Sequence, residues 1–414
     1  MSQHCRLSGR PPSAYIRGMD KEQTDILISG GGVAGLAAAV AFGAAGFSVI
    51  VVDPAPPVTD AGAEGADLRT TAFLQPAQAF LARAGLWDAL APHATALTIM
   101  RIVDAAKAPP VVRDFAASDI SDAPFGWNLP NWLLRRVMVD RIAGMDNVTL
   151  RTGTGFAGMV ARLDAALVRL GDGTSISARL VIGADGRNSA VRAAHGIDVT
   201  TTRYGQKAIT FAVTHPGPHN GISTEVHSTG GPFTLVPLPD HDGQPCSSVV
   251  WMDTGPNIMA LAALSDADFT AAANVRSAGV NGPLTLVGKR SVWPIISQIA
   301  RAITAPRTAL VAEAAHVMPP IGAQGLNMSL ADMACLLDLA VASPDTLGEP
   351  DMLQAYDKAR HGDMRLRVTG IDALNRTSMA SHPLVHDLRG LGVRALHDAT
   401  PVRRRLMKLG LGAA

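Results

Sequence analysis

The 414-residue chain has few cysteines, and the three present, Cys5, Cys246 and Cys335, lie far apart without a CxxC pair or a metal-ligand spacing. A disulfide scaffold and a metal site are therefore not predicted, and a reducing cytoplasmic environment is the simplest interpretation. Formal charges almost cancel, at +1, so nothing global attracts nucleic acid. With 17% charged and 47% hydrophobic residues, the composition indicates a packed globular protein rather than a disordered one.

The N-terminus lacks the apolar core of a secretory signal. Residues 1–23 are polar, carry Arg6, Arg10 and Arg17, and are interpreted as a loose N-terminal extension, with translation from Met19 as the alternative. Charge is absent from residues 26–52, which are long enough to cross a bilayer. Because glycines interrupt this stretch and its ends are rich in β-branched residues, we predict strand, tight turn, helix and strand instead.

Hydrophobic periodicity divides the chain into helix-rich and strand-rich parts. Residues 24–53 form a predicted βαβ unit, and a strand-rich insert follows from 205 to 255. Further strands are expected at 97–116, 148–152, 156–162, 166–170, 175–182 and 284–294, and helices at 75–90, 132–144, 260–277, 327–341, 351–378, 384–397 and 402–409.

A first glycine motif, Gly30-x-Gly32-x-x-Gly35, follows the predicted strand Ile26–Ile28 and opens the predicted helix. Gly30 permits a tight turn, Gly32 lets the backbone approach a pyrophosphate, and Gly35 lets the helix pack closely on the strand. The helix N-terminus, with Val33 and Ala34, offers free N–H groups to phosphates. Asp53, at the end of the second strand, is positioned for ribose hydroxyls, so we predict a dinucleotide site.

Two later blocks also carry polar residues after predicted strands. Asp185 and Gly186 follow the strand 180–182 and either serve a nucleotide or form an ordinary Asp-Gly turn. Glu313 follows the strand 308–311, and a glycine-rich loop then leads into a long helix. Backbone N–H groups of that loop suit a ligand on which negative charge develops. The loop residues proposed for this role are Gly322, Gln324, Gly325, Leu326 and Asn327.

Together the three blocks resemble the fingerprints of class A FAD-dependent aromatic monooxygenases, which have the para-hydroxybenzoate-hydroxylase-like fold. Within that fold, the strings DLRTTA at 67–72, GPFTLVPLP at 231–239, VWPI at 292–295 and PPIGAQGLNMSLAD at 319–332 are most similar to the ubiquinone-biosynthesis hydroxylases. The similarity runs from about residue 24 almost to the end. It implies an α/β fold, in which a Rossmann-type, glutathione-reductase-like FAD-binding domain carries an inserted β-sheet substrate domain and C-terminal helices.

The resemblance also implies the domain limits. The discontinuous FAD-binding domain is expected at 24–96, 125–200 and 290–350, the β-rich substrate domain at 97–124 and 201–289, and the C-terminal helical region at 351–414.

The resemblance assigns site residues by motif. The first motif binds the ADP half of FAD, Asp185 and Gly186 help hold FAD and pyridine nucleotide, and Arg69 approaches the flavin and pyrophosphate. The family's Gly-Asp pair is Ala312-Glu313 here, and Glu313 can still accept hydrogen bonds from ribityl or ribose hydroxyls. The arginine that often follows the asparagine at 131 is replaced by a tryptophan, so Arg135 or Arg136 is expected to take over its contact.

The implied chemistry is hydroxylation of an aromatic ring by O2, through a flavin C4a-hydroperoxide formed on reduced FAD. No side-chain nucleophile is needed, and the protein orients flavin and ring and excludes water. Only one dinucleotide fingerprint is present, so electrons come from NAD(P)H bound transiently or from another donor. Candidates for the substrate pocket are Trp251, Trp293, Pro319 and Pro320, although core packing explains either tryptophan equally well.

Two features keep alternatives open. His316 either tunes the flavin or, as we favour, makes a local structural hydrogen bond. The C-terminal region carries basic residues among leucines, such as Arg389, Arg394, Arg403 and Arg404, and forms either a peripheral contact with the inner face of the membrane or a solvated helix face.

The expected substrate is a polyprenylated ubiquinone precursor. The alternatives are a soluble phenol, or a non-catalytic scaffold subunit of a quinone-biosynthesis complex, which the altered Ala312-Glu313 pair keeps open.

Overall fold

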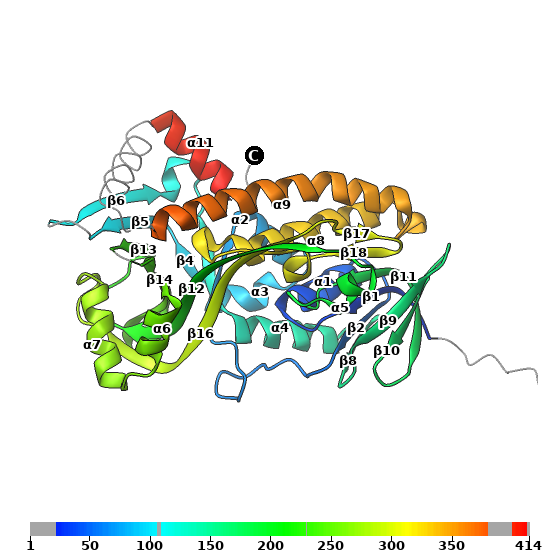
Figure 1. Ribbon diagram of the computed structural model, residues 1–414, viewed down its shortest axis with the longest axis horizontal. Helices are drawn as coiled ribbons and strands as arrows, with labels where there is room; N and C mark the ends of the chain where they lie inside the picture. The colour runs from blue at the N-terminus through cyan, green and yellow to red at the C-terminus, as the bar shows by residue number, and fades with distance from the viewer. Residues whose placement is uncertain (1–21, 106–108, 229, 380–399, 412–414) are drawn as a thin grey trace, which may run out of the picture.

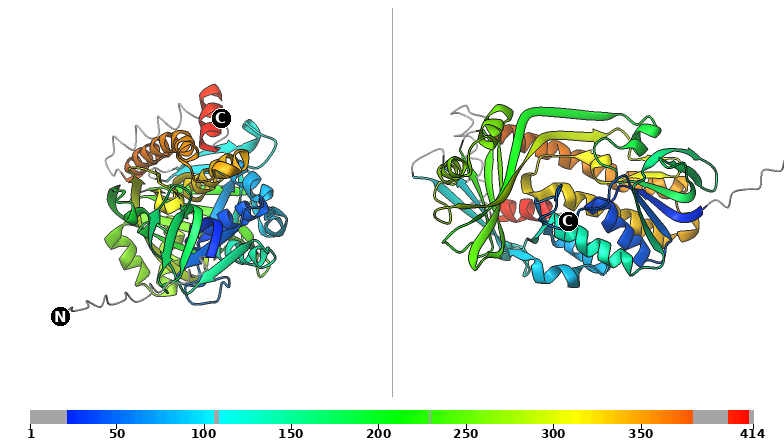
Figure 2. Two further views of the ribbon diagram at one scale, coloured as in Figure 1. Left: turned by 90° about the vertical axis from the view of Figure 1, so that its right-hand side faces the viewer. Right: turned by 90° about the horizontal axis from the view of Figure 1, so that it is seen from below.

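The computed structural model describes residues 22–105, 109–228, 230–379 and 400–411. The molecule is elongated, with one β-sheet near each end and the helix α9 (Pro350–Met379) running along it (Figure 1). The view from below shows the two sheets at opposite ends of the molecule with helices between them (Figure 2), and α11 (Thr400–Leu411) lies at the top of Figure 1. The predicted helix at 384–397 lies outside the described residues.

The first sheet is built around parallel strands. β1 (Glu22–Ser29) lies between β2 and β11, with Ile26 opposite both Val49 and Leu180. Ile26, Leu27 and Ile28 are fully buried, because α1 (Val33–Ala44) and other helices cover the sheet. The βαβ prediction for 24–53 is therefore confirmed. The remaining strands are β2 (Val49–Asp53), β8 (Val148–Thr152), β9 (Phe156–Ala161), β10 (Ala166–Leu170), β11 (Ser175–Gly183), β17 (Thr304–Ala305) and β18 (Thr308–Leu310).

The second sheet contains the strands predicted at 205–255 together with strands from outside that range. It has the order β19-β16-β12-β15-β14-β13-β5-β6 and is antiparallel except between β13 and β5. One face packs against α6 (Gly255–Ala262) and α7 (Asp266–Arg276), which replace the single helix expected at 260–277. The strands are β5 (Ile99–Asp104), β6 (Val111–Ala116), β12 (Val199–Thr214), β13 (Ile222–His227), β14 (Pro232–His241), β15 (Gln244–Thr254), β16 (Thr285–Ala300) and β19 (His316–Val317).

Strands β12 and β16 connect the two ends of the molecule. They pair from Val199 opposite Ala300 to Thr214 opposite Thr285, and both cross the domain limits that the sequence predicts. Those limits stay a prediction. A small sheet of β3 (Thr70–Leu74), β7 (Gly126–Pro130) and β4 (Thr95–Leu97) lies beside the large ones.

Apart from the division into α6 and α7, the helices follow the predicted periodicity with one further interruption. The helix expected at 75–90 is divided into α2 (Gln75–Arg83) and α3 (Trp87–Leu90), since Gly85 adopts a positive φ of 71° between them. The others are α4 (Asn131–Ala143), α5 (Ala190–Ala194) and α8 (Gln324–Ala342). One described helix, spanning 321–342, is long and apolar enough to cross a membrane, but half of it is buried, and core helices meet the same criterion.

Candidate functional site

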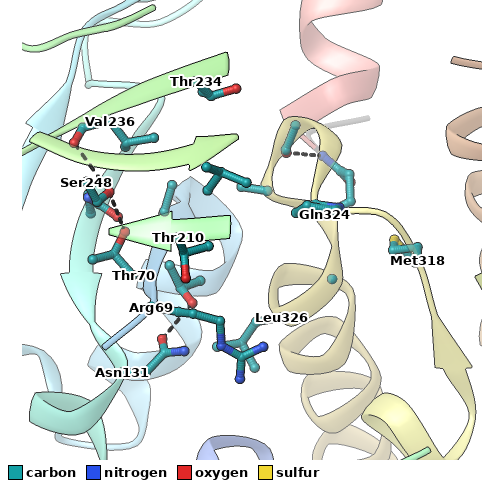
Figure 3. Close-up of a pocket in the computed structure, with 18 of the residues that line it drawn as sticks. Arg69, Thr70, Asn131, Thr210, Thr234, Val236, Ser248, Met318, Gln324 and Leu326 are labelled. Atoms are coloured by element: carbon teal, nitrogen blue, oxygen red, sulfur yellow. Dashed lines mark hydrogen bonds between the residues drawn. The ribbon is translucent and has the colours of Figure 1, made fainter. Parts of the chain in front are cut away.

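A cavity of about 860 Å³ lies between the first glycine motif, the second sheet and the loop before α8. Side chains from distant parts of the sequence line it, including Arg69, Thr210, Ser248 and Leu326 (Figure 3). It is therefore bordered by both the predicted cofactor residues and the predicted substrate domain. The predicted site residues that line it are Gly32, Val33, Ala34, Arg69, Arg135, Gly186, Trp293, Glu313, Pro320, Gly322, Gln324, Gly325 and Leu326.

The first glycine motif forms a turn in which two glycines are required by close backbone contacts. A Cβ at Gly30 would lie 2.3 Å from Ala184 O, and one at Gly35 would lie 1.9 Å from Gly30 O. At Gly32 no described atom lies within 4 Å of that position, so this glycine faces open space. The three glycines therefore behave as the motif predicts, since two permit packing and the third leaves room beside the cavity.

This turn fits the pyrophosphate of a dinucleotide. Gly32 is the N-cap of α1, provides no side-chain hydrogen bond to the helix, and lines the cavity with Val33 and Ala34. The free N–H groups and the positive end of the helix dipole thus face the cavity. Asp53, at the end of β2, accepts a hydrogen bond from Gly31 N–H at 2.6 Å, so its carboxylate lies against the turn rather than on the cavity wall.

Arg69 is fixed by a buried carboxylate. Its guanidinium donates to Asp67 at 2.8 and 2.7 Å and lies 4.0 Å above the ring of Trp293. Burial alone would raise the pKa of Asp67, but hydrogen bonds from Arg69 and Asn131 and nearby positive charge hold that pKa below its ordinary value. Arg135 lies 3.7 Å from Asp67 and lines the cavity. The sequence motif DLRTTA contains both Asp67 and Arg69, but it does not show that the ring of Trp293 lies against Arg69.

Arg136, the other arginine considered for the missing contact, lies over the ring of Trp132 at 5.0 Å. Of the two, Arg135 is the one that the fold places at the cavity.

The second block contributes through its glycine and arginine. Gly186 and Arg187 line the cavity, and Arg187 Nε lies 3.2 Å from Glu313 Oε2. Asp185 instead accepts hydrogen bonds from the N–H groups of Ala190 and Val191 at the start of α5, and it does not line the cavity. The Asp-Gly block therefore shapes the local backbone and brings an arginine to Glu313.

Some residues of the third block line the cavity, and another stabilises the fold. Gly322, Gln324, Gly325 and Leu326 line the cavity, whereas the side chain of Asn327 binds the backbone of β3. Asn327 Oδ1 accepts from Leu74 N–H at 2.8 Å, and its Nδ2 donates to Ala72 O at 2.7 Å. The same asparagine that the motif marks thus anchors α8 to the small sheet.

His316 belongs to a buried chain of ion pairs. Its Nε2 lies 2.6 Å from Asp332 Oδ2, and Arg360 Nε donates to the other oxygen of Asp332 at 2.9 Å. The chain continues through Asp363 to Arg367, which donates to Gln324 Oε1 at 3.1 Å. This arrangement supplies the local hydrogen bond that we favoured for His316, although the histidine also borders the cavity.

Strand alternation separates the two candidate tryptophans. Trp293 is the Cα partner of Ala208, whereas Trp251 is the partner of Ile209, the next residue along β12. Because successive side chains point to opposite faces, Trp293 reaches the cavity and Trp251 packs among Phe233 and Phe269 against the helices. Pro320 lines the cavity and Pro319 does not.

Several cavity residues were not identified from the sequence. A hydroxyl pair, Thr70 Oγ1 and Ser248 Oγ, lies 2.8 Å apart, and Glu225 at the cavity wall lies 2.6 Å from His227 Nε2. Asn128 also lines the cavity. The period-two pattern of the strands carried the necessary signal, but it does not say which face is covered by helices.

The C-terminal helix closes one side of the cavity. Arg403, Met407 and Gly410 of α11 line it, and Gln324 Nε2 donates to Gly410 O at 2.9 Å. Arg403 also lies 3.2 Å from Asp119, just after β6. These two contacts therefore attach α11 to parts of the fold that are far away in the sequence.

Comparison with known proteins gives a consistent result. A family described as "FAD binding domain" matches residues 23–368. The chain is 33% identical to ubiquinone hydroxylase UbiL of Rhodospirillum rubrum over 98% of its own length and 94% of that protein. It is 27% identical to 3-demethoxyubiquinol 3-hydroxylase of Escherichia coli over 95% of its own length and all of that protein.

Solved structures share the fold. The crystal structure of p-nitrophenol 4-monooxygenase PnpA from Pseudomonas putida superposes with a TM-score of 0.77 at 18% identity, covering 94% of this chain and 98% of the other. PqsL from Pseudomonas aeruginosa gives a TM-score of 0.72 at 22% identity, covering 86% and 97%. At these identities the likeness shows the fold, and the predicted α/β architecture with an added β-sheet domain is confirmed.

Proposed function

Because the chain belongs to the FAD binding domain family and is an FAD-dependent monooxygenase, we propose that it hydroxylates the aromatic ring of a polyprenylated ubiquinone precursor. Two relatives with ubiquinone-pathway names cover nearly the whole chain and support this substrate class. A soluble phenol is the alternative substrate.

The observation that carries the proposal is the shared cavity. Gly32 at the start of α1, Trp293 of β16 and Val236 of β14 border one space, so a cofactor held at the glycine turn and a ring held on the second sheet meet there. Holding two reactants in one oriented site removes much of the entropic barrier to their reaction. Apolar side chains such as Ile99, Ile102 and Phe115 on the same wall suit a prenyl chain.

Bound FAD, reduced by NAD(P)H or another electron donor, would activate O2, of which one oxygen atom goes to the ring and the other leaves as water. In our proposal the N–H groups of Val33 and Ala34 bind the pyrophosphate and Asp53 binds the ribose. Gln324, Gly325 and Leu326 hold the isoalloxazine side of the cofactor, assisted by Glu313, Arg69 and Arg135. Asp185, Gly30, Gly35 and Asn327 act indirectly, because they fix the backbone on which these groups lie.

Exclusion of water falls to the protein. Arg69 is stacked on Trp293 and paired with Asp67, and it forms part of the cavity wall. Met407 of α11 covers another side of the cavity. A closed, low-dielectric cavity strengthens polar contacts to the ring and protects reactive species from water.

The proposal is tested by quinone profiling. Cells in which this gene is deleted, and in which no redundant enzyme is present, are extracted and their quinone intermediates are identified by mass spectrometry. Accumulation of a prenylated intermediate that lacks one hydroxyl supports the proposal and identifies the ring position. An unchanged quinone pool overturns it and favours a soluble phenolic substrate.

We also propose that α11 contacts the inner face of the membrane peripherally. Arg404, Arg405 and Lys408 are exposed, and α11 contains no acidic residue. Such a cationic surface is attracted to anionic lipid. The residues Arg389 and Arg394 of the predicted basic pattern lie outside the described residues. We expect the protein to float with phosphatidylglycerol vesicles but not with phosphatidylcholine vesicles. A control variant, in which three other exposed cations are changed to Gln, should keep this difference. The control residues are Arg162, Arg169 and Lys289.

A further inference from the structure

Three polar side chains meet at the edge of the cavity where the small sheet contacts β14 and β15. In the small sheet, Ala72 is the partner of Asn128 and Thr70 is the partner of Pro130, so Thr70 and Asn128 point to the same face. Ser248 lies in β15, and its hydroxyl is 2.8 Å from that of Thr70 (Figure 3). All three residues line the cavity.

Asn128 has an unused hydrogen-bond acceptor. Its Nδ2 donates to Pro237 O at 2.9 Å, and this contact fixes the amide orientation, because a carbonyl oxygen cannot donate to Pro237. Its Oδ1 has no partner among the described residues, although the side chain is only 1% exposed. A buried acceptor without a partner is unfavourable, so it marks a place where a ligand contributes the missing donor.

The Thr70–Ser248 pair also leaves a hydrogen-bond acceptor unused. Ser248 Oγ lies 3.5 Å from Val236 O, and when it donates there, the proton between the two hydroxyls comes from Thr70. Thr70 Oγ1 then has lone pairs but no further proton to offer. Both Thr70 and Asn128 therefore face a ligand as acceptors. Ala72 and Val250 also line this part of the cavity and lower its polarity, which strengthens any hydrogen bond made there.

We propose that a ring hydroxyl of the substrate donates its single proton to Asn128 Oδ1, with the acceptor Thr70 Oγ1 beside it, and that this site selects a phenol over its methyl ether or a quinone carbonyl. A phenol O–H donates a proton, whereas an ether oxygen and a quinone oxygen only accept. A site built to hydrogen-bond a hydroxyl rejects analogues without one, because its own polar groups remain unpaired. The inference rests on the proposed function, which supplies an aromatic substrate.

The test uses the FAD-loaded full-length enzyme and a matched pair of probes, 2-prenylphenol and its O-methyl ether. Dissociation constants are measured from the change in flavin absorbance on titration. We expect Asn128→Leu to weaken binding of the phenol by roughly three- to tenfold, the loss of one neutral hydrogen bond, and to leave binding of the ether unchanged. Thr70→Val, which keeps the side-chain shape, is expected to give a smaller loss with the same selectivity. Thr234→Val removes another cavity-wall hydroxyl and is the matched control, for which the phenol-to-ether ratio should stay at the wild-type value.

The outcomes separate the two proposals. Equal binding of phenol and ether by the wild type, or equal losses for both probes in both variants, overturns the selectivity of Asn128 and Thr70 and leaves the proposed function standing. Absence of binding of either probe by yellow, folded wild-type enzyme contradicts the proposed function itself. If Asn128→Leu does not fold, Thr70→Val alone decides the selectivity.

Discussion

The two glycine-rich loops at the cavity are held in different ways. Gly30 and Gly35 are fixed by contacts that exclude any side chain, at 2.3 and 1.9 Å from backbone oxygens. The loop before α8 instead has an alanine, Ala323, at a positive φ of 55°. That loop is held by the ion-pair chain from Asp332 to Gln324. A loop can therefore keep its shape either through the absence of side chains or through the side chains of a neighbouring helix.

The largest expected effect separates packing from ligand contact within the first loop. Gly35→Ala places a Cβ 1.9 Å from Gly30 O, so we expect a loss of more than about 4 kcal/mol, or no folded protein. Gly32→Ala meets no described atom within 4 Å, so it should keep the wild-type melting temperature and lose FAD affinity. Thermal melts and flavin absorbance measure the two properties. Equal behaviour of the two variants would contradict the division of roles among the glycines.

The second loop is expected to fail through its ion pairs. Asp332→Asn leaves Arg360 without its buried carboxylate partner, and we expect a loss of about 3 kcal/mol. Asp338→Asn, on the same helix, breaks only the exposed pair with Arg83 and should change the melting temperature little. Chemical denaturation of both variants tests this difference. A small effect of Asp332→Asn would mean that backbone contacts, and not the ion pairs, hold the loop.

Asp67 lines the same cavity as the two loops and gives a pH test. Since its pKa is lowered in the folded protein, its stabilising contribution is complete above the ordinary value of 3.8 and is lost as pH falls through the lower folded value. Asp67→Asn should therefore cost about 2 kcal/mol at neutral pH, from the weakened bonds to Arg69 and Asn131. The gap between wild type and variant should persist from pH 7 to about pH 4 and narrow only below that. A gap that closes near pH 6 would be inconsistent with the lowered pKa.

The smallest expected effect is a gain. Ala323→Gly relieves the left-handed conformation, worth about 1–2 kcal/mol, but adds unfolded-state entropy of about 0.4–1 kcal/mol. We therefore expect a net stabilisation of about 0.5 kcal/mol. Ala271→Gly, at an exposed position in α7, should instead lose about 1 kcal/mol. Urea titrations of the two variants should shift in opposite directions, and destabilisation by Ala323→Gly would show that the alanine methyl group packs favourably.

Much of the fold and part of the site could be predicted from sequence. The βαβ unit and the glycine turn depend on residues within about thirty positions, so local sterics and periodicity revealed them. The site residues that line the cavity as a group, such as Gly32, Gln324 and Glu313, were also identified. The helix break at Gly85 was missed because a single glycine inside a helical pattern is often tolerated.

The sequence by itself determined where the chain makes the tight turn between β1 and α1, because Gly30 and Gly35 have no alternative under hard-sphere contact. It also determined that Trp251 and Trp293 lie in strands. Only the tertiary structure decided that Trp293 borders the cavity and Trp251 the helices, since strand alternation fixes two faces without saying what covers each. The contacts of Asn128 with Pro237 and of Gln324 with Gly410 were likewise decided by the fold, because they join positions roughly a hundred residues apart that no local pattern relates.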